Sequence, residues 1–205
     1  MTGEAVRDSA GGALIAEEAA RANLYALIGR LFYDAPDAIL LAEICQEHDG
    51  REEGDGPLAE PWRALRAAAG SAYPVVIKQE YDTLFVGVGR AEVSPYTSHY
   101  VVGLSADQHL VKLRTQLEQW GLARRDAAFE VEDHAAGICD VMRFLVLEGR
   151  PLEEQRLFFN EFAYPWLMPF CEAVAASPSA VFYRHVARFT QAFLEVEKTA
   201  IEMQV

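Results

Sequence analysis

The apolar residues in the last part of the chain recur at the spacing of one helical face. Phe182, Val186, Phe189, Phe193 and Val196 follow one another at intervals of four, three, four and three residues. Residues at this spacing lie on one side of a helix, whereas a half-buried strand alternates at every second residue. Ser177 and Pro178 precede this stripe and suit the N-cap and the first position of a helix. The segment therefore predicts a long amphipathic helix that buries one face.

The same helical spacing continues along the rest of the chain. Apolar stripes fall within residues 16–32, 39–45, 58–72, 105–120, 131–147 and 153–166. Gly, Pro and Asp residues separate them, and no segment has the pattern of a strand. We therefore predict an all-α fold, a single-domain helical bundle. The small, polar residues 1–12 are expected to be disordered, and residues 13–205 to form the domain.

Size, charge and cysteine content narrow the class of protein. A chain of 205 residues with 51% apolar content can bury one full core. Its net charge of −13 argues against binding to nucleic acid or to anionic lipids and favours basic partners. Three dispersed cysteines, no secretory signal and no membrane-spanning run predict a cytoplasmic protein without stable membrane insertion.

One stretch combines glycines, a proline and aromatic residues, and it runs from Glu80 to Tyr100 with the letters EYDTLFVGVGRAEVSPYTSHY. Tyr81 and Phe85 continue a buried helical face, and Gly87 suits the C-cap that ends it. The residues that follow predict a structured loop, because a flexible linker would lack the aromatic side chains.

At these residues the chain resembles the TorD/DmsD/NarJ-type family of chaperones for molybdenum redox enzymes. The family signature has the form LFxGPGxxxxxPYxSxY, and it is matched here by Leu84, Phe85, Gly87, Gly89, Pro95, Tyr96, Ser98 and Tyr100. Val88 replaces the family's proline between the two glycines. Three further segments are similar to the family's first helix and to its second and third motifs. They are Tyr25 to Phe32, Asp133-His134, and Phe159 to Trp166.

The resemblance implies a TorD-like helical chaperone of the cytoplasm that is not an enzyme. Such a chaperone binds the leader peptide, the body or both of a molybdopterin-containing oxidoreductase catalytic subunit. It assists cofactor insertion and prevents premature export or assembly, and it is a monomer or a dimer. The residues that the resemblance assigns to client binding are Tyr25, Phe85, Gly87, Gly89, Pro95, Tyr96, Ser98, Tyr100, Asp133 and His134.

The leader of such a client is basic and partly apolar, so it needs an acidic surface beside an aromatic-lined groove. The acids expected to meet its arginines are Glu80, Asp82, Glu92 and Asp133. Asp133 also stands at the start of a predicted helix, where a carboxylate complements the helix dipole, so a capping role for it stays open.

Catalytic and metal-binding patterns are weak. No Glu-x-x-His occurs, which argues against a di-iron bundle, and Cys45 with His48 lacks the second pair of a structural zinc site. The absence of a P-loop argues against a nucleotide-responsive chaperone. We therefore expect no catalytic residue, metal or cofactor. The alternative is a helical-bundle enzyme or a small-cofactor-binding protein with a pocket near His134 and His99.

Overall fold

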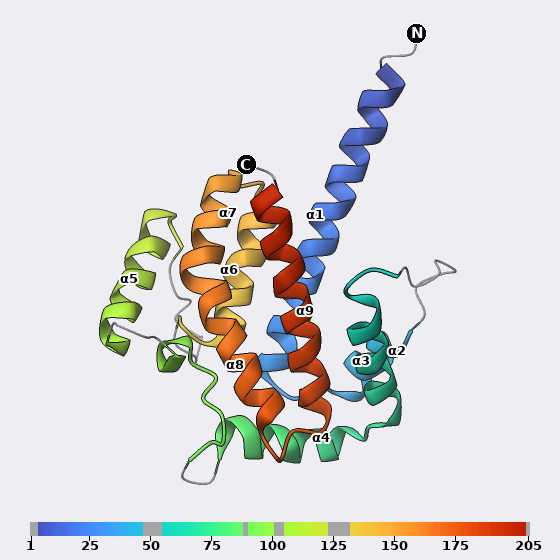
Figure 1. Ribbon diagram of the computed structural model, residues 1–205, viewed down its shortest axis with the longest axis vertical. Coiled ribbons are helices and arrows are strands. Elements are labelled where there is room, and N and C mark those ends of the chain that lie inside the picture. The colour runs from blue at the N-terminus through green and yellow to red at the C-terminus, as the bar shows by residue number, and fades with distance from the viewer. Residues whose placement is uncertain (1–3, 47–54, 88–89, 101–104, 123–131, 204–205) are drawn as a thin grey trace.

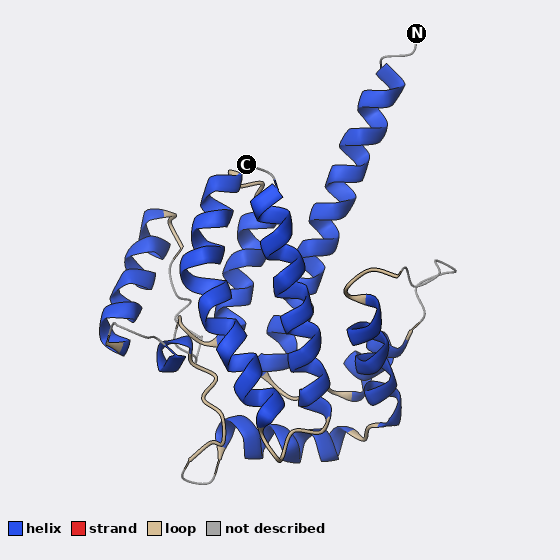
Figure 2. Cartoon of the chain, viewed as in Figure 1, coloured by secondary structure: helices blue, strands red, loops and turns tan. Residues whose placement is uncertain are grey.

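The computed structural model describes residues 4–46, 55–87, 90–100, 105–122 and 132–203. Within these ranges the chain forms helices and connecting loops without a strand, which confirms the predicted all-α fold (Figure 2). The α-helices are α1 (Glu4–Tyr33), α2 (Ala38–Cys45), α3 (Ala59–Ser71), α4 (Pro74–Tyr81), α5 (Ala106–Gln119), α6 (Ala135–Leu147), α7 (Leu152–Phe158), α8 (Tyr164–Ala176) and α9 (Phe182–Met203). Two π-helical turns, η1 (Asp82–Val86) and η3 (Phe159–Ala163), and a 3₁₀ helix, η2 (Thr97–Tyr100), complete the described elements.

The long helices pack into a bundle, and the shorter ones lie around it (Figure 1). Helix α1 packs mainly on α6, and α9 packs between α8 and α3. Helix α4 lies across one end of the bundle, while α5 lies on the side opposite to α2 and α3 (Figure 1). The loop that leaves α4 therefore leads from this end of the bundle to the side on which α5 lies (Figure 1).

The predicted apolar stripes supply the core. In α9, Phe182, Val186, Phe189 and Phe193 are each at most 3% exposed. Phe32 of α1 meets Phe170 of α8 edge to face, with 4.8 Å between the ring centroids. Burying one such phenylalanine contributes about 1.5–3 kcal/mol. The apolar faces predicted from the sequence thus pack against one another, even between helices that are far apart in the chain.

One helix start differs from the prediction. Ser177 does not cap the last helix, because its N–H donates to the carbonyls of Ala173 and Val174 and so closes α8. Helix α9 begins only at Phe182, and its first N–H groups bond to the carboxylate of Glu80 from α4. A side chain distant in sequence has taken the place of the local cap that Ser177 and Pro178 suggested.

The helical run from α7 through η3 to α8 continues past Pro165. Proline has no N–H, so the carbonyl of Glu161, four residues earlier, loses its usual helical donor. The indole N–H of Trp166 donates to this carbonyl at 2.7 Å instead. Residues 159–163 form the π turn η3, in which the Tyr164 N–H reaches back to the carbonyl of Phe159. Pro165 therefore alters the hydrogen bonding of the helix without ending it.

Helix α1 begins at Glu4, within the segment that the sequence predicts to be disordered. Its first half projects away from the bundle, whereas its second half packs on α6 (Figure 1). A helix outside the bundle lacks the tertiary packing that supplies most helical stability in water. The predicted division into residues 1–12 and 13–205 stays a prediction.

A buried polar network ties α1 to α9. Glu197 is 2% exposed, and its carboxylate accepts hydrogen bonds from Arg21 Nε at 2.8 Å and from the Tyr25 hydroxyl at 3.0 Å. Arg21 also donates to Glu18 at 2.8 Å and to Gln155 at 3.3 Å. Burial and the neighbouring Glu197 carboxylate raise the pKa of Tyr25 well above its ordinary value. The Tyr25 hydroxyl is therefore a structural hydrogen-bond donor inside the bundle.

Candidate functional site

A π turn and one glycine turn the chain out of α4. The Gly87 N–H donates to the carbonyl of Asp82, five residues earlier, at 2.6 Å. Gly87 then adopts φ 65° and ψ 148°, a conformation that essentially only glycine adopts. The chain returns so that the Val93 N–H reaches the carbonyl of Leu84 at 2.9 Å. Gly87 thus ends the helical segment, as predicted, and lays the following loop beside η1.

The loop and the Asp133-His134 motif meet in a short antiparallel bridge. The Thr97 N–H donates to the carbonyl of Asp133 at 2.8 Å, and the Ala135 N–H donates to the carbonyl of Pro95 at 2.8 Å. Between these two bonds the rings of Tyr96 and His134 pack edge to face, 5.5 Å between centroids. Two motifs that are separate in the sequence therefore form one surface.

The two residues of the Asp133-His134 motif cap different helices. His134 is the N-cap of α6, and its Nδ1 accepts a hydrogen bond from the Ala136 N–H at 3.2 Å. The Asp133 Oδ2 instead accepts from the Ser98 N–H in the 3₁₀ helix η2, at 3.1 Å. An accepting Nδ1 carries no proton, so this geometry assigns the proton of a neutral His134 ring to Nε2. The capping role at α6 that stayed open for Asp133 thus belongs to His134.

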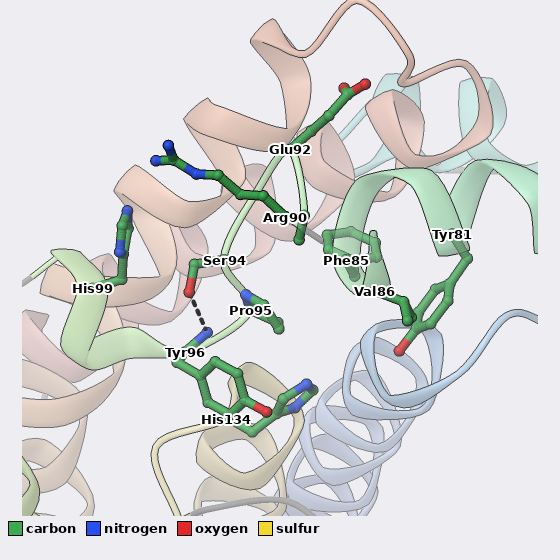
Figure 3. Close-up of a pocket in the computed structure, with 11 residues that line it drawn as sticks. Tyr81, Phe85, Val86, Arg90, Glu92, Ser94, Pro95, Tyr96, His99 and His134 are labelled. Carbon is green, nitrogen blue, oxygen red and sulfur yellow. Dashed lines mark hydrogen bonds between the residues drawn. The ribbon is translucent and has the colours of Figure 1, made fainter. Parts of the chain in front are cut away.

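These elements enclose a hollow of about 520 Å³, here called the loop groove (Figure 3). Its lining combines aromatic and apolar side chains with one cation, one carboxylate and two histidines. The lining residues are Tyr81, Phe85, Val86, Arg90, Ala91, Glu92, Ser94, Pro95, Tyr96, His99 and His134. Val86 is 61% exposed, so the groove offers apolar surface to a partner.

Glu80, one of the acids expected to meet a basic partner, is used inside the fold. Its carboxylate accepts the N–H groups of Val181, Phe182 and Tyr183 at 2.8, 3.0 and 2.8 Å. These donors lie at the start of α9, where helical N–H groups have no partner within the helix and the dipole favours a negative charge. Glu80 therefore fastens α4, and with it the start of the loop, to the C-terminal helix.

Glu92 and Asp82 are also engaged. Glu92 accepts hydrogen bonds from the hydroxyls of Ser177 and of Ser179, the latter at 2.7 Å. The bonds from Ser177 and Ser179 lower the pKa of the Glu92 carboxyl. Asp82 pairs with Lys78 at 2.6 Å. Glu80 and Glu92 thus tie α4 and the loop to the C-terminal part of the chain, whereas Asp82 takes part in a surface ion pair within one helical turn.

The predicted client-binding residues separate into groups. Phe85, Pro95, Tyr96 and His134 line the loop groove, while Tyr96, Ser98 and Asp133 line a second hollow beside it. Gly87 forms the turn, and Gly89 lies outside the described residues. The remaining two predicted residues, Tyr100 and Tyr25, line neither hollow.

Tyr100 and Tyr25 have supporting positions. The Tyr100 hydroxyl donates to the carbonyl of Ser94 at 2.9 Å, and burial raises the pKa of Tyr100 to about 12. Tyr100 therefore supports the loop through a hydrogen bond to the backbone of Ser94. Tyr25 is 0% exposed in the α1–α9 network, so it has no surface to offer to a peptide in this conformation.

Several lining residues were not assigned to the site from the sequence. Val86 reaches the groove because η1 is a π turn, and a π turn has no clear signal in the spacing of apolar residues. Asp107 and Leu110 reach the second hollow through the placement of α5. His99, named only for the alternative function, lines both hollows.

His109 links α5 to the loop and predicts a pH dependence of stability. It is 1% exposed, lies 3.5 Å from the Thr97 hydroxyl and packs against the rings of Phe162 and Trp166. Burial lowers its pKa. Below about pH 6.5, His109 is therefore protonated more readily in the unfolded chain than in the folded protein. The folded protein thus loses stability as the pH falls from about 6.5 toward the lowered pKa of the folded state.

We expect wild type to lose more unfolding free energy than His109→Gln between about pH 7.5 and about pH 5, because only wild type must protonate this buried ring. Urea denaturation of both proteins at the two pH values measures the difference. A stability gap between the two proteins that does not change with pH would contradict the assignment.

Metal and membrane sites are not evident in the described parts of the chain. There, no group of three or more His, Cys, Asp and Glu side chains is placed to hold a metal ion. Among the helices described, none combines the length and the apolar character needed to cross a membrane.

Comparison with known proteins identifies the fold and the family. Residues 51–172 match the family model described as nitrate reductase delta subunit. A TorD chaperone protein of Ferrimonas balearica is 30% identical over 195 residues, which cover 89% of this chain and 90% of that protein. A TorD chaperone protein of Photobacterium profundum is 24% identical over 157 residues, with 68% and 73% covered.

A solved structure from Archaeoglobus fulgidus, titled as a candidate redox enzyme maturation protein, has the same fold. Its TM-score is 0.55 at 20% identity, over 85% of this chain and 93% of that one. The helical bundle of this chain is thus the fold of that protein. The chain belongs to the nitrate reductase delta subunit family and, within it, to the TorD-like chaperones.

Proposed function

We propose that this protein is a cytoplasmic, non-enzymatic chaperone in the maturation of a molybdenum-containing oxidoreductase. Its client is the catalytic subunit, and it binds the leader peptide of that subunit in the loop groove. Membership of the TorD-like family supports the chaperone role. The observation that supports the site is the bridge at Tyr96 and His134, which joins two family motifs in the wall of one groove.

The chemistry of the groove suits a peptide. The exposed Val86 and the half-buried ring of Tyr96 offer apolar and aromatic surface beside the buried Phe85 and Pro95. Partly exposed aromatic rings are the side chains that contribute most at interfaces. A small-molecule enzyme near His134 and His99 is not favoured, because the His134 Nδ1 already caps α6 and so is not free to act as a base.

The client is identified by affinity capture from the native cytosol and mass spectrometry. We expect the catalytic subunit of a molybdopterin-containing oxidoreductase among the captured proteins. Leader peptides of the organism's molybdenum oxidoreductases, made synthetically, are then titrated against the purified protein by calorimetry. The absence of binding by every such peptide would contradict leader recognition.

Replacing Tyr96 by alanine is expected to weaken leader binding about 10-fold or more. An aromatic ring in contact with the peptide contributes on the order of 1.4 kcal/mol to the free energy of binding. Tyr73→Ala is the matched control, since Tyr73 is 72% exposed and does not line the groove. Calorimetric titration compares both variants with wild type. Equal losses in both variants would place the contact outside the groove.

A pair of variants at His134 separates contact from capping. Asparagine is a good N-cap, so His134→Asn keeps the cap of α6 and removes the ring, whereas His134→Ala removes both. We expect both variants to bind the leader more weakly, and His134→Ala to be about 1 kcal/mol less stable than His134→Asn, which keeps the cap. Wild-type affinity in His134→Asn would show that the ring serves the fold alone.

A further inference from the structure

One face of the helical segment formed by α4 and η1 is exposed and has a valine at each end. This face, here called the α4 stripe, consists of Val75, Gln79, Asp82 and Val86, at intervals of four, three and four residues. Residues at this spacing share one side of a helix. Val75 is 64% exposed and Val86 is 61% exposed, whereas the other side of the segment is buried at Leu84. The stripe therefore faces solvent at the end of the bundle that α4 covers (Figure 1).

The stripe lies on one continuous piece of helix. Eight residues of α4 and five of η1 follow one another, and Asp82 at the junction has helical dihedral angles, φ −62° and ψ −38°. Thirteen residues of helix, the sum of these eight and five, span about 20 Å. The two valines thus stand near opposite ends of a straight, exposed edge, with two polar side chains between them.

The stripe is complementary to itself when it is read in the opposite direction. Reversal about the point between residues 80 and 81 places Val75 on Val86 and Gln79 on Asp82. In a two-fold dimer the same patch of both copies meets, so each contact occurs twice. Two antiparallel copies of the segment bring valine against valine at both ends. At the centre, the amide of Gln79 meets a carboxylate, and an amide donates where a carboxylate accepts.

The charges at the centre of the stripe are already paired. The Nζ of Lys78 lies 2.6 Å from the Oδ1 of Asp82, at the edge of the stripe. Each Asp82 that approaches its symmetry mate therefore brings an ammonium group with it, which reduces the local repulsion. The net charge of −13 still makes two whole chains repel each other at long range, and salt screens this repulsion.

We propose that a second copy of this chain covers the α4 stripe, in a two-fold dimer with antiparallel α4 helices. A contact between two helical segments of this length is small, so the dimer is weak and reversible. Val86 also lines the loop groove, so the second copy covers part of the groove. Dimerisation and leader binding therefore compete. The competition rests on the proposed function, whereas the dimer does not.

Sedimentation equilibrium over a series of protein concentrations, at about 0.15 M salt, tests the dimer. We expect wild type to pass from monomer to dimer as the concentration rises. Val75→Asp puts a carboxylate against an apolar side chain, and it does so twice in a symmetric dimer. At about 10-fold for each copy, it should raise the dissociation constant about 100-fold or more. Aspartate in the first turn of α4 suits the helix dipole, so the fold is kept.

Val111→Asp is the matched control. Val111 is 62% exposed on α5, away from the stripe, and its replacement adds the same charge. This variant should dimerise nearly as wild type does. Equal weakening by Val75→Asp and Val111→Asp would make the effect one of net charge and overturn the proposal, as would a wild-type protein that stays monomeric at every concentration.

A mixture of two variants tests the antiparallel register. Val86→Lys alone should also dimerise poorly, because its ammonium group meets a valine twice. In a mixed dimer of Val75→Asp with Val86→Lys, the introduced charges face each other at one end, and the native valines meet at the other. The mixture should dimerise about 10-fold more tightly than either variant alone. A mixture that dimerises no better than its components would overturn this register.

Peptide titration separates the dimer from the proposed function. A leader peptide that binds wild type should convert the dimer to monomer, and it should bind Val75→Asp at least as tightly as wild type. Weaker leader binding by Val75→Asp, with no change in Val111→Asp, would show that the client covers the stripe and would overturn the second copy as its occupant. If no leader peptide binds wild type, leader recognition fails, while the sedimentation results still decide the dimer.

Discussion

Gly87→Ala is expected to lower the unfolding free energy by about 3 kcal/mol or more, because a non-glycine residue in this backbone region is strained and its Cβ has no space. A Cβ built on Gly87 would lie 2.4 Å from the carbonyl carbon and oxygen of Arg90 and from the nitrogen of Ala91. All three are backbone atoms, which cannot rotate away as a flexible side chain would. The loop must therefore leave its position, and leader binding should weaken as well. Urea denaturation and peptide titration measure the two effects.

Gly121→Ala is the matched control for that change. Gly121 has φ +71°, yet a Cβ built there meets no heavy atom of the described residues within 4 Å. It carries the conformational cost of a left-handed residue, about 1–2 kcal/mol, without the collision. The difference between the two variants isolates the close approach at Gly87. Equal stability losses would show that residues 90 and 91 adjust freely.

Glu197→Ala is expected to lower the unfolding free energy by about 3 kcal/mol or more, because it leaves the partly buried guanidinium of Arg21 and the buried hydroxyl of Tyr25 without their main acceptor. Arg21 would keep Glu18 and Gln155, but Tyr25 would lose the acceptor of its hydroxyl. The variant therefore lacks the hydrogen bonds that Glu197 of α9 accepts from Arg21 and Tyr25 of α1. Denaturation followed by far-UV circular dichroism gives the free energy.

Glu195→Ala is the control on the same helix. Glu195 is exposed and accepts a hydrogen bond from the Tyr164 hydroxyl at 2.6 Å at the surface. Its removal should cost under about 1 kcal/mol, as is usual for surface polar contacts. Similar losses for both variants would mean that the buried network does not stabilise the bundle more than a surface pair.

Local signals in the sequence predicted local structure well. The capping box of Ser105 and Gln108 is formed, and Asp37 caps α2 by accepting from the Leu40 N–H at 2.8 Å. Gly121 and Gly149, placed at predicted breaks, both have positive φ. Each of these features depends on residues within a few positions of one another, and helical periodicity likewise depends only on nearby spacing.

Contacts between distant residues were not predictable in the same way. Glu80 caps a helix that begins about a hundred residues later, and Ser177 bonds to Glu92 instead of starting α9. Family motifs indicated the region of the groove, but the placement of Asp107 and Leu110 in the same hollow as Asp133 depends on how α5 docks. Short-range patterns carry no information on which helix ends meet in space, and the second hollow is built from such a meeting.

The contacts that hold the loop on the bundle affect the entropy change of leader binding. Residues on both sides of the groove are tied to the bundle through Glu80, Glu92, Tyr100 and the bridge at Tyr96. The surface proposed to bind the leader is thus preorganised, and the entropy lost on such binding would fall mainly on the peptide. Affinity for the client should then depend on how readily its leader gives up its own conformational freedom.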